Sequence, residues 1–354
     1  QATRKLEAVY EVPYLAHACM EPMNCTAHVR RHSCDVYAPT QAQTGAQKMA
    51  ADVTGLPVSK INVHTTFLGG GFGRRFEQDF VVDALQCSKA MGAPVKVVYT
   101  REDDIQHDFY RPATYNKLAA GIDADGVPSA WAHHIVGPSI MQRALPGMAP
   151  QLMPSWLPNS FERGLGGAAA WAMGFQTDAS SVEGAANLPY AIPNLHVSYV
   201  KENGPVPVGF WRSVGNSQNG FITECFFDEV ARAGGKDPYV LRYQLLKDHP
   251  RHLGVLKLAA SKADWGVPLA PGRFRGIAVL ESFGSYVAQA VEITLRDGRL
   301  KVERVVCAID CGIVVNTSIV TAQMEGSIVF GLTAALKGEI TIDKGRVTQS
   351  NFHD

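Results

Sequence analysis

Four glycines within five residues, at positions 69–73, are the feature that most constrains this chain. They lie in TTFLGGGFGRRFEQD, residues 65–79, between a strand-like run and a helix-like run. A loop with so few Cβ atoms permits positive φ angles and lets backbone N–H groups approach a bulky anionic or metal-bound ligand closely. Phe72 then stands alone as a hydrophobic wall. The alternative is a tight strand-to-helix turn that holds no ligand.

The residues around this loop predict an α/β unit. Residues 61–67 alternate like a strand, residues 76–91 have helical periodicity with Gly92 as the C-cap, and residues 94–100 form a β-branched strand. The loop therefore lies at the carboxyl end of a strand, where open sheets usually bind ligands. It is neither a dinucleotide fingerprint nor a phosphate loop, because an aromatic residue interrupts the glycines and no Gly-Lys-Ser/Thr follows. Further along, residues 123–126 predict a hairpin turn and residues 223–233 a helix.

Composition narrows the function classes. The chain has 354 residues, 46% hydrophobic and 19% charged, and is long enough for two domains with substantial cores. Lys plus Arg and Asp plus Glu balance at 33 each, which argues against nucleic acid and favours a small-molecule ligand. The first domain is predicted to span residues 1–205 and the second residues 206–354.

The cysteines and the lengths of the apolar runs indicate whether the protein forms disulfides, spans a membrane or is exported. The seven cysteines show no CxxC pair, no zinc spacing and no ferredoxin-like run, so buried thiols are the favoured interpretation. In an exported protein, a disulfide between Cys19 and Cys25 or between Cys307 and Cys311 is the alternative. No run of 18 or more apolar residues predicts a membrane span, and residues 1–9 do not resemble a signal peptide. The chain is expected to be a segment of something longer.

Two further motifs combine glycine with polar side chains. In VGFWRSVGNSQNGF, residues 208–221, Arg212 offers a rigid fork of donors suited to oxyanions, with a cation–π surface pair as the alternative. In CGIVVNTSIVTAQMEGSIVFGL, residues 311–332, Gln323 lies on a helix predicted over residues 318–335. That helix is either part of a ligand site or a core helix with polar residues on its flank.

Charged stretches elsewhere are predicted to be structural. In HACMEP, residues 17–22, the histidine is interpreted as a satisfied core residue, because no second His follows at i+4. The charge-rich REDDIQHDFY, residues 101–110, predicts a solvated surface turn. Arg74 and Arg75 either contact phosphate or cap surface acids.

The three motifs, in this order, resemble the molybdenum hydroxylases, the family of xanthine dehydrogenase, aldehyde oxidoreductase and carbon monoxide dehydrogenase. The Arg-Arg after the glycine loop and the WRSVGNSQN sequence resemble the branch that contains the large (beta) chain of isoquinoline 1-oxidoreductase. The resemblance implies an α+β fold, with mixed α/β molybdopterin-binding domains and the cofactor between two subdomains. The cofactor-binding residues that it implies are Gly70, Gly71, Phe72, Gly73, Arg212, Ser213 and Gln323.

The resemblance also implies where the substrate binds. Leu15 stands where purine-oxidising relatives have Gln, and Phe76 where they have Glu, so a purine is disfavoured. With Phe72 and Trp211 these residues form the predicted substrate pocket. An aldehyde oxidised to its acid is the favoured substrate class, and an N-heteroaromatic ring hydroxylated beside nitrogen is the alternative.

Residues 138–181 are predicted to roof a substrate funnel. They are rich in Pro, Gly, Ala and Met without regular periodicity, and such long segments in compact domains are usually functional. Packing against a neighbouring subunit or domain is the alternative. The candidate wall residues are Trp156, Phe161, Trp171 and Phe175.

The remaining expectations follow from the resemblance alone. The cofactor is expected to be a molybdopterin cytosine dinucleotide with molybdenum, whose metal needs no protein ligand. Relatives place the catalytic Glu in a Gly-Glu-Pro-Gly run, which this sequence lacks, so the base is expected beyond Asp354. A [2Fe-2S] small subunit, with a c-type cytochrome as a further candidate, is the expected partner. A periplasmic or membrane-associated location is expected, with the cytoplasm as the alternative. A non-catalytic cofactor- or partner-binding scaffold is the alternative of another class.

Overall fold

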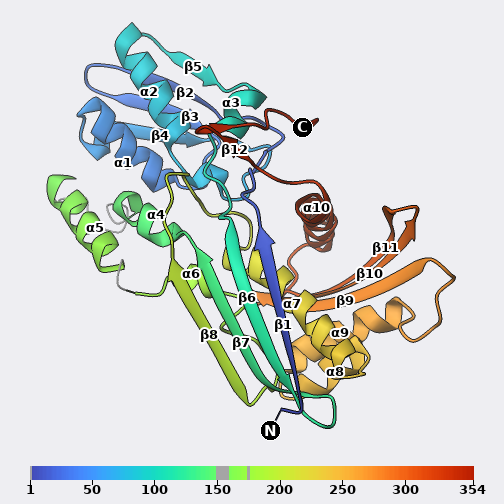
Figure 1. The fold of residues 1–354 in the computed structure, drawn as a ribbon. Helices are drawn as coiled ribbons and strands as arrows, with labels where there is room; N and C mark the ends of the chain where they lie inside the picture. Colours follow the sequence, from blue (N-terminus) through green and yellow to red (C-terminus); the bar gives the residue numbers. More distant parts are fainter. Residues whose placement is uncertain (1, 149–158, 174–175) are drawn as a thin grey trace.

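The computed structural model describes residues 2–148, 159–173 and 176–354, in which helices flank three sheets and a C-terminal hairpin (Figure 1). One sheet has the order β1-β6-β7-β8, with β7 and β8 parallel and the other pairs antiparallel. The predicted turn at residues 123–126 joins β6 to β7, and Gly126 adopts a φ of 78° there. The strands are β1 (Arg4–Val12), β6 (Thr114–Ile122), β7 (Pro128–Gly137) and β8 (Asn194–Lys201).

The glycine loop belongs to a second sheet with the order β4-β3-β2-β5. As predicted, the loop follows a strand and precedes a helix that ends at Gly92, whose φ is 63°. That helix begins at Asp79 instead of Phe76, because Arg74–Phe76 forms a 3₁₀ turn. The elements are β2 (Asn24–Val29), β3 (Cys34–Ala38), α1 (Gln43–Thr54), η1 (Val58–Lys60), β4 (Ile61–Thr65), η2 (Arg74–Phe76), α2 (Asp79–Met91) and β5 (Val95–Val98).

A third, antiparallel sheet has the order β11-β10-β9 and packs against helices α7 and α9. The helix predicted from residue 223 begins earlier, at Gly215, and is buried along much of its length. The elements are α7 (Gly215–Ala233), α8 (Pro238–Leu245), α9 (Pro250–Lys262), β9 (Arg273–Ser282), β10 (Ser285–Arg296) and β11 (Arg299–Asp310).

The largest core cluster draws on both sides of the predicted domain boundary. Leu118 and Trp131 of the first sheet are buried together with Phe226 of α7 and Ala288 of β10. A smaller core cluster packs against Phe72 of the glycine loop, and Cys19, Cys25 and Cys34 are among its members. The boundary at residue 205 stays a prediction, since the main core is continuous across it.

The acidic stretch at residues 101–110 is not a solvated turn, which corrects the prediction. It forms helix α3 (Arg101–Gln106), capped reciprocally by Thr100 and Asp103. Asp104 and Asp108 are both buried. The prediction failed because the charge pattern along the sequence does not show which distant residues pair with these acids in the fold.

The segment predicted to roof a funnel is partly helical, with α4 (Ile140–Met148), α5 (Asn159–Met173) and α6 (Ala179–Val182). Helices α4 and α5 pack against each other. Trp171 is 70% exposed on α5 and does not line the groove near Arg212, and its role as a wall residue stays a prediction. Trp156 and Phe175 lie outside the described residues, and so does the side chain of Phe161.

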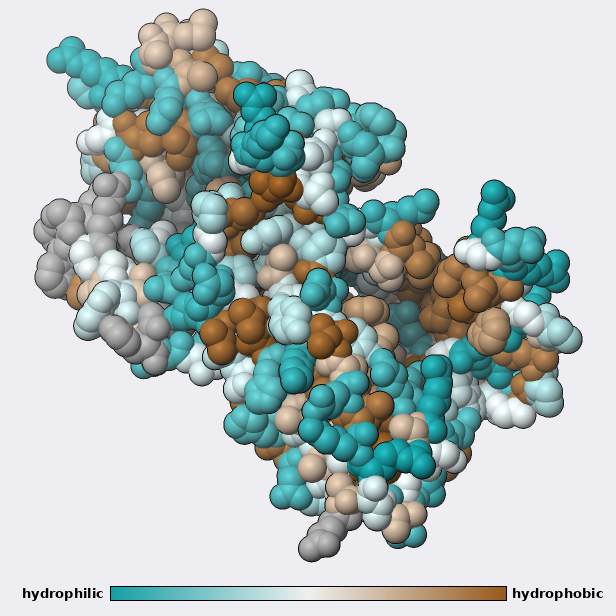
Figure 2. All heavy atoms as spheres, viewed as in Figure 1, coloured by the Kyte–Doolittle hydropathy of each residue, from teal (hydrophilic) through white to brown (hydrophobic). Residues whose placement is uncertain are grey.

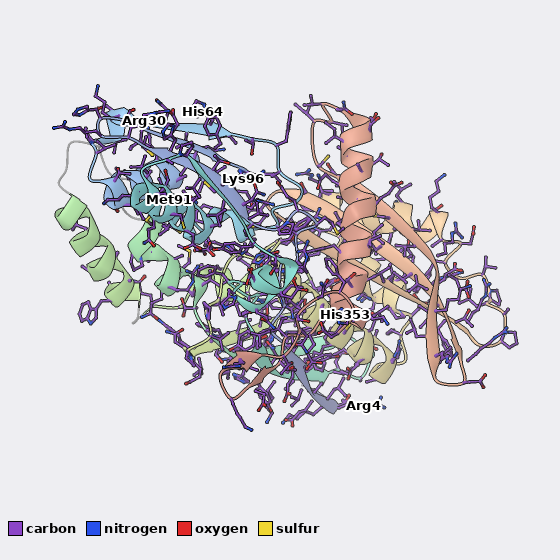
Figure 3. The ribbon with its side chains drawn as sticks, turned by 90° about the horizontal axis from the view of Figure 1, so that it is seen from above. Arg4, Arg30, His64, Met91, Lys96 and His353 are labelled. Carbon is purple, nitrogen blue, oxygen red and sulfur yellow. The ribbon has the colours of Figure 1, made fainter. Side chains whose placement is uncertain are left out.

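Helix α10 (Thr317–Leu336) confirms the helix predicted over residues 318–335, and a hairpin of β12 (Ile342–Asp343) and β13 (Arg346–Val347) follows it. Seen from above, α10 stands beside the three-stranded sheet, away from Arg30 and His64 on the β2–β5 sheet (Figure 3). By length and composition it is apolar enough to cross a membrane, contrary to the expectation from uninterrupted apolar runs. One such helix is weak evidence for a membrane span, because a core helix passes the same test. None of the apolar window of α10 is buried in this structure.

Candidate functional site

The three sequence motifs meet in an aromatic stack. Phe72 of the glycine loop stacks on Phe330 of α10, with ring centroids 4.5 Å apart. Trp211 stacks on Phe330 as well, at 4.6 Å. Stacked aromatic pairs stabilise packing beyond the area they bury. Residues more than 250 positions apart in sequence are thereby brought into one contact.

Arg212 lies beside this stack. Its Nη2 donates to Gln323 Oε1 at 3.1 Å, and its guanidinium carbon is 5.9 Å from the centre of the Phe72 ring. No salt bridge joins Arg212 to a carboxylate within the described part of the chain. Partial burial lowers the pKa of Arg212, because a desolvated guanidinium loses hydration that no counter-charge replaces. The predicted positions 72, 212 and 323 are therefore brought together.

The turn that carries Arg212 is strained. Ser213 and Val214 both have positive φ angles, 70° and 50°, which side chains with a Cβ adopt at a cost of about 1–2 kcal/mol each. Helix α7 begins directly after them at Gly215, where an added Cβ would lie 2.1 Å from the carbonyl oxygen of Ser180. Such strain persists only where the surroundings fix the backbone.

The glycine loop packs against protein on several sides. Gly73 has a φ of 108°, and a Cβ there would lie 1.6 Å from the carbonyl oxygen of Phe210. A Cβ on Gly71 would lie 2.5 Å from Oε1 of Gln41, which accepts a hydrogen bond from the Gly73 N–H. The requirement for glycine at position 73 thus follows from a backbone contact within the chain, whereas at position 71 only the end of the Gln41 side chain would have to move.

A groove of about 700 Å³ opens next to Arg212, between α7, the β9–β11 sheet and α10. Apolar side chains gather over α10 and the neighbouring strands around this hollow (Figure 2). Its walls include Arg212 and Ser213 at one end, Met324 of α10, and Ser282 and Phe283 from the turn between β9 and β10.

Polar residues of the groove fit a ligand that carries both anionic oxygens and N–H donors, such as a molybdopterin. The two carboxylates in the lining, Glu224 and Asp228, are paired with Arg242. The guanidinium of Arg212 has no counter-charge, and two buried oxygens in the lining, Ser282 Oγ and Asn216 Oδ1, have no hydrogen-bond partner among the described residues. Buried polar atoms without partners are rare in native proteins, and a ligand is one explanation for them. The volume lies within the range of sites that hold cofactors.

The predicted substrate residues are only partly assembled. Trp211 is buried in the aromatic stack, where its indole N–H donates to the carbonyl of Ala16 at 3.3 Å. Leu15 is also buried and packs near Gly338. Phe76 packs edge-to-face on Phe210 at 5.7 Å. None of these residues lines the groove, and neither does Phe72. Of the predicted cofactor-binding residues, only Arg212 and Ser213 do.

Sequence reasoning missed the buried charges behind the loop. Arg74 is buried and pairs with Asp79 and Asp108, while Arg75 pairs with Glu21 and donates to the carbonyl of Gly70. Both arginines therefore bind acids of the chain itself. Glu21 and Asp79 are partly exposed, in line with the predicted capping of surface acids, whereas Asp108 is buried. No local signal reveals this pairing, because two of the three acids lie outside the motif.

Phe330 was also missed, although its spacing carried a signal. It follows Gln323 by seven positions, and residues seven apart lie on the same face of a helix. All seven cysteines belong to the described residues and are free thiols, so neither of the disulfides considered from the sequence forms there. Burial raises the pKa of Cys19 and of Cys25 to about 12.

Comparisons with known proteins agree with this geometry. A family model described as a molybdopterin cofactor-binding domain matches residues 1–140, and a second model of that description matches residues 278–354. The chain is 31% identical over 357 residues to the beta subunit of isoquinoline 1-oxidoreductase from Brevundimonas diminuta, over 98% of this chain and 42% of that protein. It is 25% identical to the membrane-bound aldehyde dehydrogenase (pyrroloquinoline-quinone) of Gluconacetobacter polyoxogenes, over 98% of this chain and 46% of that one.

Solved structures share the fold. The aldehyde oxidoreductase of Desulfovibrio gigas superposes with a TM-score of 0.57 at 20% identity, over 85% of this chain and 33% of that one. Quinoline 2-oxidoreductase from Pseudomonas putida 86 gives 0.58 at 17% identity, over 82% and 36%. The chain spans less than half the length of these relatives.

The fold and the two domain matches define a molybdopterin-binding protein with a mixed α/β architecture. More specifically, the chain belongs to the molybdenum hydroxylase family, as part of its large, cofactor-binding subunit. The family assigned from the three motifs, and the fold class expected with it, are confirmed.

Proposed function

We propose that this chain forms the cofactor-binding part of an oxidoreductase that converts an aldehyde to a carboxylic acid. The observation that carries the proposal is the guanidinium of Arg212, which has no acidic partner among the described residues and lies at one end of a groove of cofactor size. A cation left without a counter-charge beside a cavity is suited to an anionic ligand.

The residues around the groove have separable roles in holding the cofactor. Arg212 donates to its anionic oxygens, and Gln323 orients Arg212 through the bond at 3.1 Å. Ser213 lines the groove beside Arg212. The family resemblance assigns the backbone at Gly70, Gly71 and Gly73 to the cofactor as well, together with Phe72, whose ring lies next to the Arg212 guanidinium. When bound, the cofactor supplies the two-electron redox chemistry of substrate oxidation.

The substrate lies against the aromatic stack in this proposal. The partly exposed rings of Phe72 and Phe330 provide an apolar surface beside Arg212, which suits an uncharged aldehyde, and the buried Trp211 packs behind Phe330. Hydroxylation of an N-heteroaromatic ring is the second candidate. It is favoured by the stacked aromatic rings, and by the name of the Brevundimonas relative, isoquinoline 1-oxidoreductase.

The cofactor form, partners and location extend the proposal. The cofactor is a molybdopterin cytosine dinucleotide, and its electrons leave through a [2Fe-2S] small subunit and a c-type cytochrome. Support comes from relatives whose names describe them as subunits, such as the molybdenum-binding subunit of an aldehyde oxidoreductase from Escherichia coli. A periplasmic or membrane-associated location is proposed on the name of the membrane-bound aldehyde dehydrogenase.

The proposal is tested on the intact protein purified with its natural partners. Molybdenum is measured by mass spectrometry, and acid-released nucleotide identifies the dinucleotide form. Oxidation of benzaldehyde and of isoquinoline is followed with an artificial electron acceptor. We expect molybdenum, cytidine monophosphate and faster oxidation of the aldehyde. Preference for isoquinoline would establish the second candidate, and molybdenum without turnover would favour a scaffold.

A further inference from the structure

We propose that His17 and Asp108 act as a positioning pair for Arg212. Through the carbonyl oxygen of Phe210 they fix the strained turn that aims the guanidinium at the groove. That Arg212 binds the cofactor rests on the proposed function, whereas the positioning of its turn by His17 and Asp108 does not.

The pair is buried and fully hydrogen-bonded. His17 and Asp108 are each about 1% exposed. The backbone N–H of His17 donates to Asp108 Oδ2 at 2.6 Å, and its ring Nδ1 lies 3.0 Å from both carboxylate oxygens. Its Nε2 lies 2.9 Å from the carbonyl oxygen of Phe210. Both ring nitrogens thus face oxygen acceptors, and the ring bridges the Asp108 carboxylate and the Phe210 carbonyl.

Asp108 is held ionised by two cations. Burial raises its pKa, but the charge of His17 and then that of Arg74, whose Nε lies 3.1 Å from Oδ1, outweigh burial and hold the pKa below its ordinary value. The same arginine makes two further bonds to Asp79, at the start of α2. One buried cluster therefore connects the glycine loop, α3 and the turn before Arg212.

The carbonyl of Phe210 is clamped from two sides. His17 donates to it, and Gly73 packs so closely that an added Cβ would lie 1.6 Å from the oxygen. Two residues later comes Arg212, followed by the two positive φ angles of Ser213 and Val214. A turn with such strain needs an anchor on each side, and here the anchors are the clamped carbonyl and helix α7.

Backbone hydrogen exchange in the intact protein tests the positioning. The reporters are the amides of Gly209 and Val214, which donate to the carbonyls of Tyr110 and Trp211. His17→Leu removes both ring donors at similar volume, whereas His17→Gln keeps one donor for Phe210. The matched control is His133→Gln, since His133 is equally buried but bonds Asn116 in the first sheet.

We expect His17→Leu to speed exchange of the two reporter amides about tenfold, with His17→Gln in between and His133→Gln unchanged. Thermal stability is expected to fall in all three variants. A general loss of stability therefore cannot explain amide exchange that is fast in His17→Leu, intermediate in His17→Gln and unchanged in His133→Gln. Unchanged reporter amides in folded His17→Leu, or equal acceleration in His133→Gln, would overturn the proposal. If His17→Leu does not fold, exchange of the same two amides is measured in His17→Gln and Asp108→Asn. Faster exchange than in the wild type supports the proposal, and unchanged exchange in both overturns it. Molybdenum measured on the same samples tests the proposed function separately, because a metal-free wild type would leave the exchange result standing.

Discussion

Replacing Gly73 with alanine is expected to destabilise the protein more than an added methyl group elsewhere in the glycine loop. The new Cβ would lie 1.6 Å from the oxygen and 2.6 Å from the carbon of the Phe210 carbonyl. Both neighbours are backbone atoms, so no flexible side chain can move aside. The loop and the turn before Arg212 would have to separate by more than an ångström.

The magnitude has two parts. A positive φ of 108° costs a residue with a Cβ about 1–2 kcal/mol. Forcing packed backbone segments apart costs about 1–3 kcal/mol more. The expected loss in the free energy of unfolding is therefore about 2–5 kcal/mol, measured by urea denaturation followed by circular dichroism.

Gly92→Ala is the matched control. Gly92 also has a positive φ, 63°, at the end of α2, but an added Cβ there meets no atom within 4 Å. The free energy of unfolding of Gly92→Ala is expected to fall only by the cost of the positive φ, about 1–2 kcal/mol. If Gly73→Ala lost no more than this control, the clamp on the Phe210 carbonyl would be refuted.

Three further predictions follow from the same contacts. Asp108→Asn leaves buried cations without their counter-charge and is expected to lower the free energy of unfolding by about 3–5 kcal/mol in urea titrations. Burial and the charge of Asp108 raise the pKa of Asp104 to about 6 from its ordinary 3.8. Because the folded-state pKa is above the unfolded value, ionised Asp104 destabilises the fold. Its contribution to the free energy of unfolding therefore falls by up to about 3 kcal/mol as pH rises from 4 to 6. Asp104→Asn should remove that slope, and identical pH profiles of unfolding would contradict this. Gln323→Glu supplies Arg212 with a carboxylate and is expected to lower molybdenum content without changing the urea midpoint, and full metal content would speak against the role of Arg212.

Local signals explain the parts of the fold that were predictable. Gly92 ends α2 as expected, and the turn at residues 123–126 forms the expected hairpin. The helix over residues 318–335 is present as well. Each of these depends on neighbours in sequence, through backbone freedom at glycine or through helical periodicity.

The unpredicted parts depend on partners far apart in the chain. Asp108 is buried because His17 and Arg74 reach it from 91 and 34 positions away. The early start of α7 at Gly215 is a tertiary effect, since its first turn consists of weak helix formers that are buried against residues 180–184. The proximity of positions 72, 212 and 323 was expected from the family resemblance alone, and the structure supplies the contacts.

Molybdenum content in Arg212→Gln tests the central claim most directly, with Arg296→Gln as the control at an exposed position of β10. We predict about one molybdenum per chain in the intact wild type and in the control. Loss of a charge-assisted bond should lower the content of Arg212→Gln about tenfold or more in cofactor-limited samples, while the urea midpoint of the cofactor-free protein stays unchanged. Wild-type protein without molybdenum, or Arg212→Gln with a full complement, would contradict the account.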